Sequence, residues 1–140
     1  MITSIDTNIL VALWDTDDAL NSFAQDALDK AFACGKLVIS GAVFAELLAF
    51  PGRTETFLDE FLRDTRIVVE WDTDESIWRT AGSAFQAYAK RRRKQRAGGP
   101  RRILADFLIG AHALERNHTL LTLDDGIYRA AFPKLRLLKV

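Results

Sequence analysis

The segment at the start of the chain reads Ile2-Thr3-Ser4-Ile5-Asp6-Thr7-Asn8-Ile9-Leu10. Residues 2–5 predict a short buried strand, and the turn-prone triplet from Asp6 to Asn8 ends it. A carboxylate between two apolar segments loses much of its hydration, and this loss costs several kcal/mol unless a positive partner compensates it. Asp6 therefore marks both the end of a strand and a place where a partner is expected.

Strands and helices alternate through the rest of the chain. Apolar segments predict further strands at 37–39, 67–69, 119–122 and 136–138. Helical spacing, with caps at Ser40 and Asp74 and breaks at Pro51-Gly52 and Gly98-Gly99-Pro100, predicts helices at about 17–34, 41–50, 54–64, 75–93, 103–116 and 127–132. The alternation favours an α/β class with three α/β/α layers around a mostly parallel sheet. We expect a single domain over residues 1–140.

Three more acidic residues stand in apolar segments. Glu46 lies in Phe-Ala-Glu-Leu-Leu, Asp106 in Leu-Ala-Asp-Phe-Leu, and Asp124 follows Leu-Leu-Thr-Leu. In open parallel sheets the sites form at the carboxyl ends of the strands, where all four acids can meet. Because no Lys or Arg lies within these four segments, one shared divalent cation is the economical compensating charge. Carboxylate ligands favour Mg²⁺ or Mn²⁺.

Each acid also has an ordinary structural interpretation. Asp6 and the triplet Asp124-Asp125-Gly126 have residue types common in turns and caps. Glu46 could lie on a solvated stripe of its helix, and Asp106 could complement the dipole of a helix N-terminus. The hypothesis of a shared site therefore depends on all four converging.

The net charge of zero hides a division between the halves. Residues 1–75 carry 15 acids and 5 bases, whereas residues 76–140 carry 4 acids and 14 bases. The bases concentrate before Asp106, and such a cluster attracts phosphates. The alternative is a solvated helix end. The candidate phosphate-binding residues are Arg91, Arg92, Arg93, Lys94, Arg96, Arg101 and Arg102.

Other classes of protein and site are disfavoured. With one cysteine and two histidines, the spacing of a Cys/His zinc site is absent. We expect His112 to be a partly buried structural residue and His118 to be exposed. No apolar run approaches the roughly 18 residues of a membrane span, and no secretory signal is predicted. A single cysteine fits the cytoplasm.

The motifs together resemble the PIN domain, and more narrowly the VapC-type toxins of bacterial toxin–antitoxin pairs. The similarity runs from residue 2 to about 138. It rests on the segments Ser4-Ile5-Asp6-Thr7-Asn8-Ile9-Leu10, Ser40 with Glu46, Ala105-Asp106-Phe107-Leu108-Ile109, and Leu121-Thr122-Leu123-Asp124 with Gly126 and Tyr128.

This resemblance implies a Mg²⁺- or Mn²⁺-dependent endoribonuclease that hydrolyses RNA with metal-activated water. It implies a cognate antitoxin and a homodimer as partners. The basic residues between Arg91 and Arg102 would then bind RNA, and the tail of an antitoxin could use the same residues. Its acidic quartet would be Asp6, Glu46, Asp106 and Asp124, with Asp6 and Asp106 as the firmest metal ligands. Asn8 and Thr122 would orient carboxylates and water. Asp125 departs from the family's common pattern, which has a basic or neutral residue at this position. The resemblance therefore leaves open how Asp124 and Asp125 divide the catalytic role.

Two other functions compete with this interpretation. A catalytically idle RNA- or protein-binding module on the same fold would lack one acid of the quartet, and none is missing. A phosphotransfer receiver domain would need a phosphoacceptor Asp after a central strand and a Lys after a late strand. Here the strand at 67–69 is followed by Glu70-Trp71-Asp72, and no Lys follows the strand at 119–122, which counts against this function.

Overall fold

The computed structural model describes residues 1–95 and 102–138. Its centre is a four-stranded, all-parallel sheet in the order β3-β2-β1-β4. The strands are β1 (Ile2–Ile5), β2 (Lys36–Ser40), β3 (Val68–Glu70) and β4 (Thr119–Leu121). Parallel strands need crossover connections, which the helices between them provide. The predicted α/β class and parallel sheet are confirmed.

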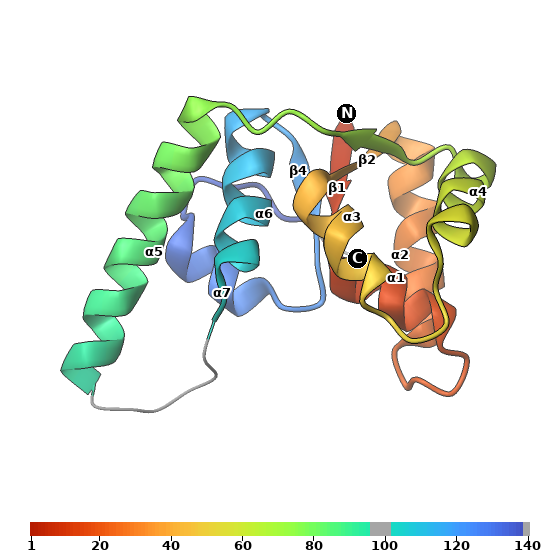
Figure 1. Ribbon diagram of the computed structural model, residues 1–140, viewed down its shortest axis with the longest axis horizontal. Helices are drawn as coiled ribbons and strands as arrows, with labels where there is room; N and C mark the ends of the chain where they lie inside the picture. The colour runs from red at the N-terminus through yellow and green to blue at the C-terminus, as the bar shows by residue number, and fades with distance from the viewer. Residues whose placement is uncertain (96–101, 139–140) are drawn as a thin grey trace.

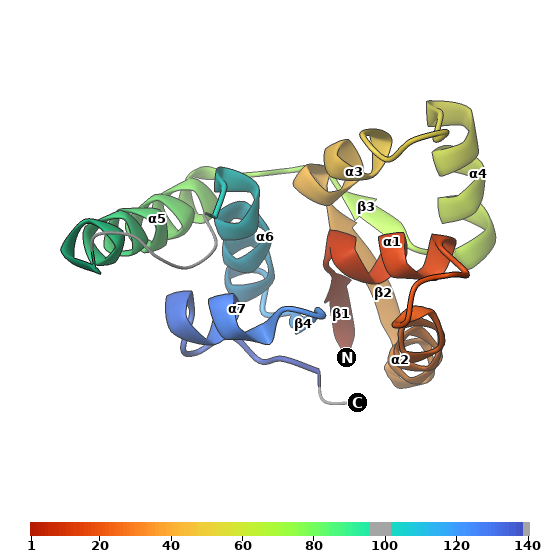
Figure 2. The ribbon, with the colours of Figure 1, turned by 90° about the horizontal axis from the view of Figure 1, so that it is seen from below.

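Helices cover both faces of this sheet (Figures 1 and 2). Helices α3 (Gly41–Leu48) and α6 (Leu104–Glu115) lie on one face, and α2 (Asn21–Cys34) lies on the other. The long α5 (Glu75–Gln95) packs outside α6. The remaining helices are α1 (Thr7–Trp14), α4 (Glu55–Thr65) and α7 (Asp125–Ala131). No helix within the described ranges is both long and apolar enough to cross a membrane.

The register of the sheet brings the ends of its central strands together. Ser4 pairs with Val38 of β2 and with Leu120 of β4. The chain therefore leaves β1 at Asp6, level with Ser40 at the end of β2 and with Thr122 beyond β4. Ser40 then caps α3 by accepting a hydrogen bond from the Val43 N–H, as the sequence predicted.

The strands are apolar because their side chains form the core of the molecule. Fully buried aliphatic side chains on β1, β2 and β4 pack against α1, α3 and α6, among them Ile5, Ile39 and Leu121. Gly110 of α6 lies against the Phe132 ring so closely that an added Cβ would stand 2.3 Å from Cε2. A side chain there would force these two segments apart.

Three local predictions were wrong. The triplet from Asp6 to Asn8 is the start of α1, because Asp6 caps the helix and Ile9 is buried on its inner face. The helix expected from about 17 begins at Asn21, after turns that Asp15 and Asp18 stabilise by accepting backbone N–H bonds. The last predicted strand, 136–138, is a single bridge between Leu137 and Leu120.

Candidate active site

The four acidic side chains of the sequence hypothesis line one cleft of about 370 Å³. They come from four parts of the chain: Asp6 after β1, Glu46 in α3, Asp106 in the first turn of α6, and Asp124 just before α7. The cleft lies at the carboxyl ends of β1 and β4, where an open parallel sheet exposes its loops. The fold therefore brings together residues up to 118 positions apart.

Asp6 is the most buried of these acids, with 5% of its surface exposed. Its Oδ1 accepts a hydrogen bond of 2.7 Å from the Thr7 N–H. Its Oδ2 accepts bonds from the hydroxyls of Thr122, at 2.7 Å, and Tyr128, at 3.0 Å. A carboxylate oxygen has two acceptor positions, so Oδ1 keeps one for a further partner.

The electrostatic state of Asp6 shows that these bonds do not fully replace water. Burial raises its pKa to about 6, although the hydrogen bonds from Thr122, Tyr128 and Thr7 oppose the shift. The nearby charge of Asp106 raises it further. Ionisation of Asp6 therefore costs free energy in the folded chain, and a bound cation would reduce this cost.

Tyr128 is a neutral donor throughout the physiological range. Its side chain is 1% exposed, and burial together with the charge of Asp6 raises its pKa. The phenol therefore keeps its proton and directs it at Asp6 Oδ2. Tyr128 entered the sequence hypothesis only as part of a motif, because a tyrosine 122 residues away from Asp6 gives no local sign of such a contact.

Glu46 is held by a residue that the sequence hypothesis did not assign to the site. The hydroxyl of Thr7 donates a 2.6 Å hydrogen bond to Glu46 Oε1. Thr7 is the first residue of α1, so the same turn that binds Asp6 through its backbone also positions the carboxylate of α3. The one available signal was its place directly after Asp6.

Asp106 is half-buried at the N-terminus of α6. Its Oδ2 accepts the Ile103 N–H at 3.3 Å, which ties the carboxylate to the helix end. Partial burial raises the pKa of Asp106, and the charge of Asp124 adds to the shift, whereas the Ile103 N–H and the charge of Arg102 oppose it. The dipole interpretation and the site interpretation are therefore both compatible with its position.

Asp124 and Asp125 have different surroundings. Asp124 lines the cleft, and its Oδ2 lies 2.6 Å from a guanidinium nitrogen of Arg102. Asp125 is exposed and pairs with Arg129, one turn along α7, at 3.1 Å. The premise that no cation accompanies the acids therefore needs correction for Asp124, because the fold brings Arg102 to it from 22 residues away.

A hydrogen-bond network holds the loop after β4 against the start of α1. The Thr122 hydroxyl donates to Asp6 and accepts the Asp124 N–H at 3.0 Å. Asn8 accepts the Leu123 N–H at 3.1 Å and donates weakly to Thr122 at 3.4 Å. Asn8 and Thr122 thus fix the distance between the Asp6 and Asp124 backbones.

The donor set of the cleft suits a hard divalent cation. It consists of four carboxylates, with hydroxyl and amide groups behind them, and Arg102 is the single basic side chain among the described cleft-lining residues. Hard cations such as Mg²⁺ take oxygen ligands and keep several waters. The raised pKa values of Asp6 and Asp106 indicate negative charge that the described residues leave partly uncompensated.

The described residues of the basic segment lie at the end of α5 and at the cleft. Arg91, Arg93 and Lys94 are exposed on the last turns of α5, and Arg92 lies 6.0 Å from the ring centre of Tyr88. These turns point to the same end of the molecule as the first turn of α6 (Figure 1). Arg96 and Arg101 lie outside the described residues, and Arg102 is the residue paired with Asp124.

A protein-family model described as PIN domain matches residues 4–133. No curated protein sequence matches the chain.

Solved structures of similar fold cover almost the whole chain. VapBC2 from Rickettsia felis, crystallised with a DNA fragment from its promoter, has 24% identity and a TM-score of 0.70, over 99% of this chain and 98% of that one. VapBC-1 from nontypeable Haemophilus influenzae has 23% identity and a TM-score of 0.66, with the same shares covered. Mycobacterium tuberculosis VapC20, described as a sarcin-ricin loop cleaving toxin, has 17% identity and a TM-score of 0.60, over 96% and 98% of the two chains.

Proposed function

Because this chain belongs to the PIN domain family, we propose that it is a Mg²⁺- or Mn²⁺-dependent endoribonuclease and the toxin of a toxin–antitoxin pair. The observation that carries the proposal is the convergence of four carboxylates from four segments on one cleft. A catalytically idle binding module has no need to keep four acids at the electrostatic cost that the pKa of Asp6 records.

Asp6 and Asp106 would be the direct ligands of the cation. Asp6 offers the remaining acceptor position of Oδ1, and Asp106 faces the same cleft from α6. Glu46 would bind the cation or one of its waters, while Thr7 fixes its Oε1. Asp124 would complete the site, in competition with its ion pair to Arg102.

A bound Mg²⁺ or Mn²⁺ would lower the pKa of a water molecule and stabilise negative charge on phosphate oxygens. The chain's own residues supply orientation around it. Tyr128 and Thr122 hold Oδ2 of Asp6, so that carboxylate has one fixed rotamer. Asn8 and Thr122 keep the loop of Asp124 beside it, a supporting role that matters for the precision of such sites.

RNA would reach the cleft along the basic end of α5. Exposed Arg91, Arg93 and Lys94 provide positive charge at the rim, and Arg102 carries it to the acids. Arg102 can bind either Asp124 or a phosphate through the same fork of N–H donors. We propose that a phosphate of the incoming RNA replaces Asp124 as the partner of the Arg102 guanidinium, and that Asp124 is then free to bind the cation.

An antitoxin and a second copy of the chain are the proposed protein partners. Two of the similar solved structures are described as VapBC, and one includes DNA from the promoter. Large apolar side chains are exposed on this chain, including Phe23, Phe32, Trp71 and Trp78. We propose that these partners bury the exposed apolar side chains. We also propose that the protein acts in the cytoplasm.

The experiment that tests the function is RNA cleavage by the purified chain. Structured and unstructured RNA substrates are incubated with Mg²⁺ or Mn²⁺, with EDTA, and with Ca²⁺ as a divalent control. Internal cleavage in Mg²⁺ or Mn²⁺ and none in EDTA supports the proposal. Intact RNA under all conditions, while the folded chain still binds RNA, would favour the idle binding module.

The contribution of the basic segment can be measured separately. Replacing Arg91, Arg93 and Lys94 with Gln should weaken RNA binding and reduce the slope of log K against log salt by up to about 2, since a neutralised phosphate contact in single strands contributes about 0.7. Filter binding or fluorescence anisotropy at several salt concentrations gives this slope. The matched control replaces Arg63 and Arg66, bases near the C-terminus of α4, and should leave it unchanged. An equal slope in wild type and triple variant would remove this segment from the interface.

A further inference from the structure

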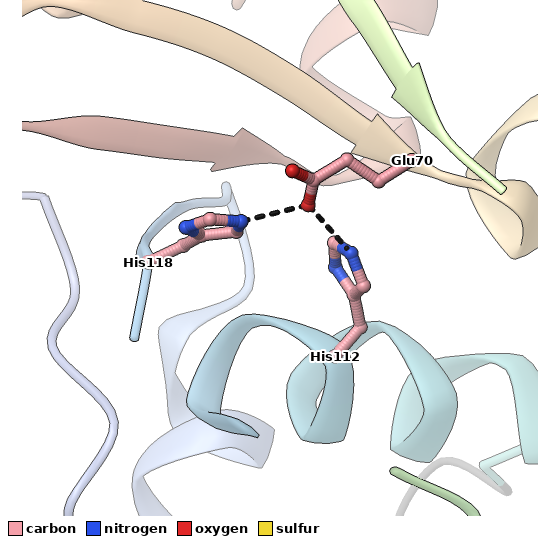
Figure 3. Close-up of side chains that lie close together, drawn as sticks. All are labelled: Glu70, His112 and His118. Atoms are coloured by element: carbon pink, nitrogen blue, oxygen red, sulfur yellow. Dashed lines mark hydrogen bonds and ion pairs between the residues drawn. The ribbon is translucent and has the colours of Figure 1, made fainter. Parts of the chain in front are cut away.

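A second cluster of metal-binding side chains lies away from the acidic cleft. Glu70 at the end of β3, His112 in the last turn of α6 and His118 just before β4 meet at one point (Figure 3). His112 stands six residues after Asp106 on α6, about 9 Å along the helix axis. The two clusters therefore lie toward opposite ends of the same helix.

The three side chains are close enough together to bind the same metal ion. Glu70 Oε1 lies 2.7 Å from Nε2 of His118 and 3.0 Å from Nε2 of His112. All three donor atoms lie within 4.8 Å of one another. Figure 3 shows both imidazole rings beside the same carboxylate oxygen.

His112 is the member of the cluster whose ring nitrogens lack well-aligned hydrogen bonds among the described residues. It is 2% exposed, and neither ring nitrogen has a well-aligned hydrogen bond with any described residue, despite the short distance from Nε2 to Glu70. A buried nitrogen without a well-aligned hydrogen bond costs free energy, and a metal ion bound at Nε2 would satisfy that nitrogen.

We propose that Glu70, His112 and His118 form a binding site for a divalent transition-metal ion, with Zn²⁺ as the ion of best fit. Two imidazole nitrogens and one carboxylate oxygen are a known three-ligand set for zinc, with water in the fourth position. Donors about 2.0–2.1 Å from a tetrahedral zinc stand about 3.3 Å apart. The two distances from Glu70, 2.7 and 3.0 Å, would lengthen slightly, and the two histidine nitrogens already lie within 4.8 Å of each other. The Glu70 side chain, 28% exposed, leaves a route for that water.

The surrounding charges permit a cation at this point. Glu70 supplies the one carboxylate of the cluster, and both histidines contact it. The positive charge of Arg116 lies nearby and would repel a bound cation. Its guanidinium is drawn away by the Asp72 carbonyl, at 3.2 Å, and by Asp74, at 3.6 Å.

The two clusters would select different ions. Imidazole ligands favour zinc and its neighbours, whereas the carboxylates of the cleft favour Mg²⁺ or Mn²⁺. A metal at the histidine site would join the end of β3 to α6 and to the start of β4, the helix and strand that lead to Asp106 and Asp124. Its role would thus be structural, and the inference does not depend on the proposed nuclease activity.

Zinc titration of the untagged chain tests the site. The experiment is done in millimolar Mg²⁺, which competes for the acidic cleft, and in a Cys34→Ser background, because the exposed Cys34 thiol is another zinc ligand. We expect one Zn²⁺ per chain and a melting temperature raised by about 5–10 °C when free Zn²⁺ is a hundredfold above Kd. Glu70→Gln and His118→Gln should each weaken binding at least tenfold.

Asp6→Asn is the matched control, and it should leave zinc affinity unchanged. Equal affinity in wild type and Glu70→Gln would overturn the site, and so would loss of binding in Asp6→Asn. Co²⁺ gives a second measurement that needs no variant at the buried His112. Intense visible absorption from tetrahedral cobalt is expected, and only the weak bands of an octahedral oxygen site would contradict the assignment.

Discussion

Replacing Asp106 or Asp6 with Asn is expected to reduce Mg²⁺-dependent RNA cleavage more than about a hundredfold. Loss of groups that merely support metal ligands costs about 10- to 100-fold, so loss of a direct carboxylate ligand should cost more. Asn has nearly the shape of Asp but is neutral. Its side-chain oxygen can still accept the Ile103 N–H at position 106 or the Thr7 N–H at position 6, which keeps both helix starts intact.

The measurement is the single-turnover cleavage rate of a labelled RNA under saturating enzyme. Asp125→Asn is the matched control, since the exposed Asp125 pairs with Arg129 outside the cleft, and its rate should stay within about twofold of wild type. Circular dichroism and melting curves establish that each variant is folded. Cleavage at the wild-type rate by folded Asp6→Asn or Asp106→Asn would eliminate the proposed metal site.

The same Asp6→Asn substitution should stabilise the metal-free chain at alkaline pH. The folded pKa of Asp6 is about 6, raised above its unfolded value of 3.8 chiefly by burial. Between these two values the folded state binds more protons than the unfolded state, so stability falls as pH rises from about 4 to above 6. A shift of about 2 units corresponds to a penalty on the order of 2–3 kcal/mol, which Asn removes.

Urea unfolding at pH 8 and at pH 4.5 in EDTA measures this effect. The variant should exceed wild type in free energy of unfolding by about 2 kcal/mol at pH 8, and the difference should shrink at pH 4.5, where wild-type Asp6 is protonated in the folded state. Addition of Mg²⁺ should favour wild type instead, because the cation then compensates the carboxylate. A variant that is less stable than wild type at pH 8 without metal would show that the hydrogen bonds of Asp6 outweigh its burial.

These two expectations describe one trade-off. Asp6 is placed where hydroxyl donors hold it rigid but water is largely excluded. A rigid, poorly hydrated carboxylate is a good ligand and a costly one in the absence of its cation. Arg102 reduces the same cost for Asp124 through an ion pair that RNA phosphate can replace.

Much of the architecture follows from local sequence. The apolar segments of β1, β2 and β4, the caps at Ser40 and Asp74, and the position of Asp106 in a first helical turn were all predicted and are observed. Such features depend on residues a few positions apart, whose distances the backbone geometry of a strand or helix already sets. The start of α1 was missed because Asp and Asn are equally common in turns and at helix caps.

The expectation that His118 is exposed was wrong, since it is 6% exposed and bonded to Glu70. The spacing argument against Cys/His zinc sites was sound for ligands near one another in sequence. It could not detect a carboxylate 48 residues from His118, because nothing in the local sequence links β3 to β4. The contacts of Tyr128 with Asp6 and of Arg102 with Asp124 escaped for the same reason.

By itself the sequence determined the parallel α/β class and the positions of the four acids relative to the predicted strands and helices, because both follow from short-range patterns of hydrophobicity and turn chemistry. Only the tertiary structure decided which partners surround each acid: Thr7 with Glu46, Tyr128 with Asp6, Arg102 with Asp124 and not with Asp125. It also decided that Glu70 and both histidines meet. The physical reason is that the register of the sheet and the packing of α6 fix distances between segments far apart in sequence, and pKa values and ligand sets depend on those distances.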